Sequence, residues 1–163
     1  MYQPYPGSAE LPAARRPPLP ASVHLAVRLM YAGAVASVLN AGVDVATVSA
    51  TRRAIVKLAG PAGAGAPGRL SHALVGGFVA DGLIGVALWL LIAWGCRNGM
   101  AWGRILGTIV CVIATVDLVV ILATGLLSVP ARLGWAVVWL LGLIVIVLLW
   151  RRDSSAFFRA ASS

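Results

Sequence analysis

The stretch LGWAVVWLLGLIVIVLLW, residues 133–150, carries no charged side chain. A helix needs about 20 predominantly apolar residues to cross the hydrocarbon core of a bilayer, because it rises about 1.5 Å per residue. An uncharged run of this length is typical of a transmembrane helix. The sequence therefore predicts that the chain lies in a membrane.

The rest of the chain supports this prediction. Of its 163 residues, 60% are hydrophobic and only 11% are charged, whereas an ordinary soluble domain carries about 25% charged residues. Three further apolar runs reach the spanning length: residues 23–48, 70–94 and 104–126. The links after the second and third runs are short, so consecutive helices should be antiparallel neighbours. We therefore expect an all-α membrane protein, with residues 23–150 forming an antiparallel bundle of four transmembrane helices.

Three segments lie outside the predicted spans. Residues 1–22 hold six prolines, which favours a disordered cytoplasmic tail. In the connection 51–70, the sequence RRAIVKL is compatible with a short interfacial turn, and the Gly/Ala/Pro-rich second half predicts a flexible linker. Residues 151–163 are expected to form a cytoplasmic juxtamembrane tail.

That last tail combines arginines with two phenylalanines. Arg151, Arg152 and Arg159 surround Phe157 and Phe158 just beyond the fourth run. We predict that these arginines bind anionic headgroups while the phenylalanines enter the interface. The alternative is a solvated tail, because each arginine contributes only about 1 kcal/mol of attraction.

The net charge of +8 raises the question of nucleic-acid binding. The basic residues, however, lie singly or in pairs at the ends of apolar runs, where they meet headgroups. No basic stripe is interleaved with aromatic residues, so we expect lipid rather than nucleic acid as the partner.

The positive charges also predict an orientation, because they favour the cytoplasmic side of a membrane. With the N-terminus inside, eight basic residues lie inside and five outside. The inner set is Arg15, Arg16, Arg28, Arg97, Arg104, Arg151, Arg152 and Arg159, and the outer set is Arg52, Arg53, Lys57, Arg69 and Arg132. We expect a multi-pass protein of the cell (plasma) membrane with both termini in the cytoplasm.

Polar residues in three of the runs share one face of each helix. In the first run Asn40 and Asp44 follow small residues at spacings of three and four. In the second run, GGFVADGLIG (76–85) places Asp81 on one stripe with Gly77 and Gly85. In the third run, Asp117 shares a sector with Gly103, Gly107, Ala114, Thr124 and Gly125. The fourth run has no polar seam and is expected to be the most lipid-exposed helix or an oligomer contact.

The aspartates differ in predicted depth. Asp81 and Asp117 should be level near the middle of the bilayer, whereas Asp44 should lie near the outer interface, where water can reach it. A carboxylate ionised at the bilayer centre costs at least about 2.5 kcal/mol, so the neutral acid is favoured. The central pair could join two helices by hydrogen bonds, relay protons or cations entering past Asp44, or face a water pocket without a special role.

Three segments carry a resemblance: ASVHLAVRLMYAGAVASVL (21–39), GRILGTIV (103–110) and IVLLWRRDSSAFF (146–158). They resemble segments that occur in the same order in a group of small, uncharacterised four-helix membrane proteins of actinobacteria. The resemblance implies location and topology, and it supplies no catalytic or ligand residues.

The sequence lacks a motif for a nucleophile, a metal ion, a nucleotide or haem. We therefore expect no catalytic residues, metal site or cofactor, and no enzymatic activity. The preferred hypothesis is an accessory, scaffold or regulatory membrane component with a homo-oligomeric or membrane-protein partner. The alternative is a small proton- or cation-coupled transporter or channel subunit that uses the intramembrane aspartates.

Overall fold

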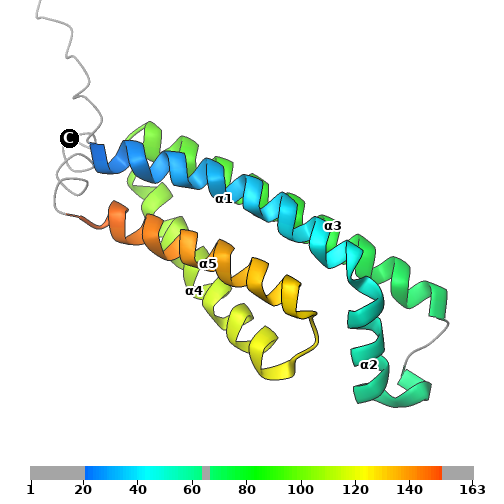
Figure 1. Ribbon diagram of the computed structural model, residues 1–163. Coiled ribbons are helices and arrows are strands. Elements are labelled where there is room, and N and C mark those ends of the chain that lie inside the picture. The colour runs from blue at the N-terminus through cyan, green and yellow to red at the C-terminus, as the bar shows by residue number, and fades with distance from the viewer. Residues whose placement is uncertain (1–20, 64–66, 152–163) are drawn as a thin grey trace, which may run out of the picture.

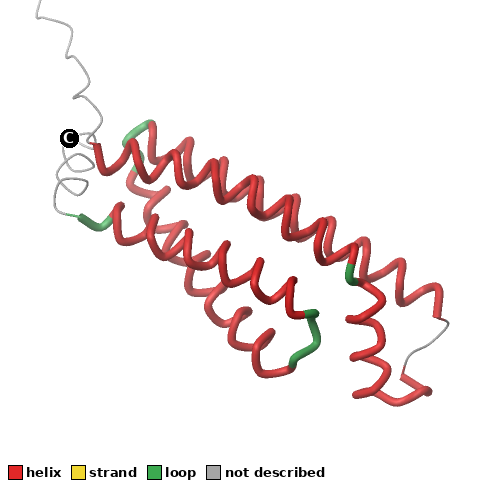
Figure 2. The backbone as a smooth tube through the Cα atoms, viewed as in Figure 1, coloured by secondary structure: helices red, strands yellow, loops and turns green. Residues whose placement is uncertain are grey.

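The computed structural model of the protein describes residues 21–63 and 67–151, and the described residues form helices and no strands (Figures 1 and 2). The helices are α1 (Ala21–Ala46), α2 (Val48–Gly63), α3 (Pro67–Arg97), α4 (Ala101–Thr124) and α5 (Val129–Leu149). The predicted all-α class is confirmed. The predictions for residues 1–20 and for Arg152 and Arg159 fall outside the described residues.

Four of the helices, α1, α3, α4 and α5, are long and apolar enough to cross a membrane. Each also turns large apolar side chains outward, for example Val35, Leu83, Val119 and Val147, which are 61–66% exposed. An apolar surface this extensive suits hydrocarbon rather than water. The structure thus supports a multi-pass membrane protein with four spans.

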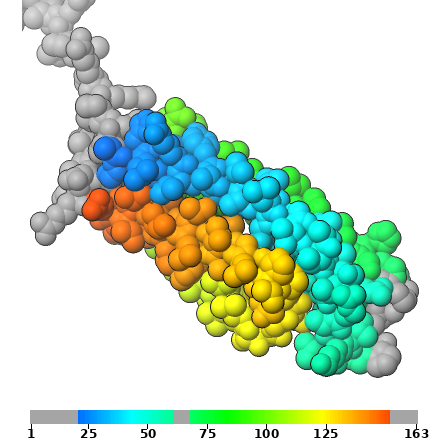
Figure 3. Space-filling model, viewed as in Figure 1, coloured from blue at the N-terminus to red at the C-terminus, as the bar shows by residue number. Residues whose placement is uncertain are grey.

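Helix α1 is central to the packing. It contacts α3 along one side and α5 along another, while α4 contacts α3 and α5. Figure 3 shows α1 and α5 side by side on one face of the molecule. The tightest part of the core lies where α1 begins and α5 ends, with Val23, Met30, Cys96 and Leu149 fully buried. The four long helices therefore enclose an interior to which each contributes one face.

The prediction that the fourth run is the most lipid-exposed is wrong. Among the four spanning helices α4, not α5, has the smallest buried share. Helix α5 packs against both α1 and α4. Two indole N–H groups bond to α4: Trp139 of α5 donates to Thr115 Oγ1 at 2.9 Å, and Trp150, directly after α5, donates to Thr108 Oγ1 at 3.2 Å. Tryptophan supplied polar contacts that a search for aspartate, asparagine and threonine could not find.

Small residues bring α1 and α3 together. A Cβ atom on Gly82 would lie 2.6 Å from Ala41 Cβ, and one on Gly33 would lie 2.6 Å from the Trp89 ring. Close approach of this kind is typical of helices packed in membranes. Gly77, which the sequence placed in the same stripe as Asp81, is exposed and has open space where its Cβ would be. The contact runs through Gly82, which adjoins the predicted stripe, and through Gly85 of that stripe, where a Cβ would lie 3.4 Å from Ser37 Oγ.

The connection between α1 and α3 is more ordered than the sequence suggested. Instead of a short turn and a flexible linker, residues 48–63 form α2, which is kinked at Gly60 (φ 72°) and packs against α3 and α1. Thr51 is buried while Leu58 is 69% exposed. In Figure 1, α2 turns away from the line of α1 beside the start of α3.

Local signals define the turn between α4 and α5. Helix α4 ends at Gly125, whose φ of 61° favours glycine. Helix α5 begins after Ser128, whose Oγ accepts a hydrogen bond from the Ala131 N–H at 3.4 Å, and Pro130 occupies its first turn. Ser128 Oγ also lies 3.0 Å from Thr47 Oγ1, so this turn is fixed to the end of α1.

Candidate functional site

A cavity of about 280 Å³ lies between the four spanning helices. Its walls come from α1, α3, α4 and α5, and most of them are aliphatic or aromatic. The polar side chains that reach it include Ser37, Asn40, Asp81 and Asp117. Three of the four candidate residues of the sequence, Asn40, Asp81 and Asp117, are thereby brought to one cavity.

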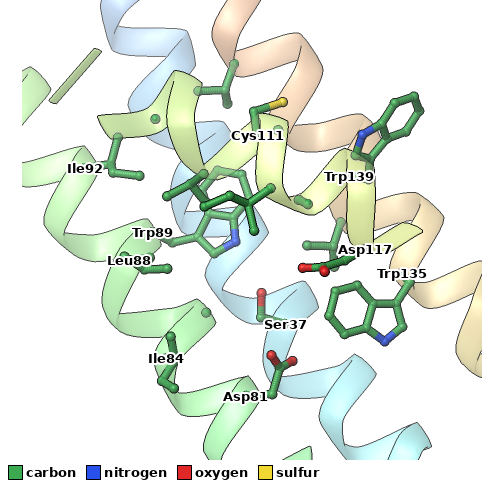
Figure 4. A pocket seen from close by; sticks show the side chains of 18 of the residues that line it. Ser37, Asp81, Ile84, Leu88, Trp89, Ile92, Cys111, Asp117, Trp135 and Trp139 are labelled. Atoms are coloured by element: carbon green, nitrogen blue, oxygen red, sulfur yellow. The ribbon is translucent and has the colours of Figure 1, made fainter. Parts of the chain in front are cut away.

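Three of these polar residues lie at one level of the bundle. Ser37 lies sixteen residues after the start of α1, and Asp117 lies sixteen residues after the start of α4. Asp81 lies sixteen residues before the end of α3. Because α3 and α4 are joined by one short turn, Asp81 and Asp117 both lie about 24 Å along their helices from that turn. In Figure 4, Asp81 and Asp117 point into the same space, with Ser37 between them.

The two aspartates face the cavity without being joined. Within the described part of the chain, neither side chain forms a hydrogen bond or a salt bridge, and both residues are exposed. They are nevertheless close enough to interact electrostatically. The direct hydrogen bond that the sequence suggested between α3 and α4 is therefore not formed. None of the described residues that line the cavity is basic, so no cationic side chain balances the pair.

The other two candidates form a buried pair at the cavity's edge. Asn40 Nδ2 donates to Asp44 Oδ2 at 3.1 Å, and the residues are 8% and 2% exposed. Asn40 Oδ1 is buried without a hydrogen-bond partner, whereas the buried Trp135 indole N–H lies close enough to the Asp44 carboxyl group to interact with it. The Asn40 side chain packs directly against Gly134. Unpaired buried polar atoms of this kind are uncommon and call for a reason.

Asp44 corrects one expectation. The sequence placed it near the outer interface, within reach of water, but its side chain is enclosed by protein. It lies near the end of α1, and its neighbours include Asn40 of the same helix and Trp135 of α5. Asp44 interacts electrostatically with Asp81 but does not line the cavity.

Three tryptophans supply the aromatic part of the wall: Trp89 from α3, and Trp135 and Trp139 from α5. The Trp139 N–H is already used by Thr115, which holds that ring in place, while Trp89 fills the space opposite Gly33. Figure 4 shows Trp89 and Trp135 on opposite sides of Ser37.

Sequence reasoning missed these tryptophans as cavity residues, whereas Ser37 belongs to the stripe of the first run that was expected to face the interior. A signal was present: in the fourth run, residues 135, 138, 139, 142, 145 and 146 all line the cavity, and they recur at the spacings of one helix face. In a helix that is apolar all round, this face cannot be told from the others until its neighbours are known.

The proposed headgroup-binding residues fall largely outside the described part of the chain. Only Arg151 is described, and it is exposed.

No protein-family model, curated protein or solved structure matches the chain.

Proposed function

We propose that the protein is a non-catalytic, integral component of the cell membrane, in which α1, α3, α4 and α5 form an antiparallel transmembrane bundle. Both termini lie in the cytoplasm, and α2 lies at the outer surface. The exposed apolar faces of the four helices and the distribution of basic residues support this arrangement.

The end of the bundle assigned to the cytoplasmic side has the composition of an interface. Trp94 and Trp102 lie with their ring centroids 6.4 Å apart, and the Arg104 guanidinium stacks 4.5 Å from the centroid of the Trp150 ring. Arg97 Nη1 donates to the Tyr31 hydroxyl at 3.2 Å. Tryptophan, tyrosine and arginine together are typical of the headgroup level.

Within this arrangement we propose a proton- or cation-coupled transporter or channel subunit. The observation that carries the proposal is that Asp81 and Asp117 face one intramembrane cavity with no basic lining residue and no hydrogen bond between them. A carboxyl group in a membrane is costly, and here no bond to another helix offsets that cost. A role in binding a cation or a proton gives the pair a reason to be there.

The two carboxyl groups of the cavity suggest how a cation and a proton would be exchanged. Two carboxyl groups that face one cavity can bind either a proton or a cation. A cation that enters the cavity and binds the pair would displace a proton from it. Transport of this kind requires the cavity to open to each side in turn.

The accessory or scaffold function favoured from the sequence makes a different prediction, since it needs no ligand in the cavity. Flux in proteoliposomes separates the two. The purified full chain, reconstituted with a pH gradient, should move protons or cations across the bilayer, and Asp81→Asn and Asp117→Asn should abolish the movement without affecting reconstitution. Asp153→Asn makes the same change of side chain beyond the fourth apolar run of the sequence and is the matched control. Absence of flux, with a stoichiometric membrane partner co-purifying from native membranes, would favour the accessory function.

A further inference from the structure

We propose that the cavity binds a small organic cation of the quaternary ammonium type, with its charge between Asp81 and Asp117 and its apolar groups against Trp89 and Trp135. This inference rests on the proposed transport function and names its substrate class.

The first argument is charge. Asp81 and Asp117 supply two carboxyl groups, and the described lining residues include no lysine, arginine or histidine. Asn40 also lines the cavity, but its Oδ1 is buried against Gly134 and is not one of the groups that would meet a ligand. The Ser37 hydroxyl donates to Gly33 O at 3.0 Å, so it offers only lone pairs to a ligand. The two carboxyl groups and the serine oxygen are acceptors, which suit a cation better than an anion.

The second argument is the aromatic wall. Trp89, Trp135 and Trp139 all line the cavity. The face of an indole ring attracts a cation more strongly than any other side-chain ring, and aromatic walls recognise quaternary ammonium ions. Such an ion cannot donate N–H hydrogen bonds, so a wall of rings and carboxyl groups meets all of its requirements.

The third argument is the poor fit of an inorganic ion. Calcium takes six to eight oxygen ligands, but no group of three or more Asp, Glu, His or Cys side chains in the described ranges could hold a metal ion. The volume of about 280 Å³ lies near the lower end of pockets for organic ligands, roughly 300 Å³. It suits a small organic ion rather than a bare metal ion or a nucleotide.

The test compares two probes of one shape. Benzyltrimethylammonium and neopentylbenzene differ in having N⁺ or carbon at the branched centre. The full chain, purified in detergent, is titrated with each probe, and binding is measured by equilibrium dialysis. We expect saturable binding of the cation only, weakened at least tenfold by Asp81→Asn combined with Asp117→Asn and unchanged by Asp153→Asn. Trp135→Leu should weaken binding several-fold more than Trp94→Leu, because Trp94 does not line the cavity.

Cys111 provides a second readout, since it lines the cavity. With Cys96→Ala, its alkylation by N-ethylmaleimide should be slowed by the bound cation. Equal binding of both probes, no saturable binding at millimolar concentration, or full binding by the double Asn variant would overturn the inference. Loss of the inference does not entail loss of the function: proton or inorganic-cation flux that depends on Asp81, without binding of the organic probe, would leave transport standing. Specific binding of the organic cation without any flux would support the ligand inference and contradict the transport function.

Discussion

Asp81 of α3 and Asp117 of α4 lie equally far from the turn that joins their helices, and they face one cavity without a hydrogen bond between them. A carboxyl group bonded across the interface would hold the helices together. One that faces a cavity contributes little to stability and is available to a ligand. The following predictions separate these consequences.

Replacing Asp117 with leucine should leave the bundle as stable as the wild type, or more stable. The variant loses no interhelical hydrogen bond, since none is formed within the described residues, and it removes the cost of a carboxyl in the membrane. Thermal unfolding in detergent measures this, with Asp117→Asn as the isosteric comparison. A clearly lowered midpoint for Asp117→Leu alone would mean that the carboxyl stabilises the α3–α4 contact after all.

Gly82→Ala should destabilise the protein by about 1–3 kcal/mol, the usual effect of overpacking. The new Cβ would lie 2.6 Å from Ala41 Cβ, so α1 and α3 must separate. Gly77→Ala is the matched control, because its Cβ meets nothing, and alanine's higher helix propensity should leave stability unchanged or slightly raised. Equal unfolding midpoints for the two variants would contradict the α1–α3 packing described here.

Trp139 and Thr115 should be energetically coupled. Their 2.9 Å hydrogen bond joins α5 to α4, and interhelical bonds in membranes average about 0.6 kcal/mol. A double-mutant cycle of Trp139→Phe and Thr115→Val, read by unfolding free energy, should give a coupling of about that size. A control cycle of Trp94→Phe and Thr115→Val should give zero coupling. Zero coupling in both cycles would mean that the Trp139–Thr115 hydrogen bond does not contribute to stability.

Cysteine labelling should place α2 outside and the α3–α4 turn inside. On a background of Cys96→Ala and Cys111→Ala, Ala62→Cys should react with a membrane-impermeant maleimide in intact cells. Asn98→Cys, at an exposed position, should react only after lysis. The opposite pattern would invert the orientation inferred from the positive charges.

A peptide of residues 150–163 should bind vesicles that contain anionic lipid more tightly than neutral vesicles, because it carries Arg151, Arg152 and Arg159. The attraction should weaken as salt is raised. Vesicle co-sedimentation at two salt concentrations measures both effects, and equal binding to the two kinds of vesicle would favour a solvated tail.

The sequence alone determined the helical class and the four spans. Long apolar runs have one stable form in hydrocarbon, where every backbone N–H and C=O must be satisfied within the segment. It also predicted that Asn40, Asp81 and Asp117 face the interior, because polar residues at helical spacing leave few other arrangements in lipid. These properties depend on local composition and periodicity, which one sequence contains.

Tertiary structure decided what lies opposite each of these residues. The sequence could not show that Gly82 rather than Gly77 meets α1, that Asp44 is enclosed, or that Trp135 and Trp139 face the cavity. Each of these facts depends on how far one helix is rotated and shifted against its neighbour. That choice follows from the fit of side chains on two surfaces at once, and no single run of sequence contains both surfaces.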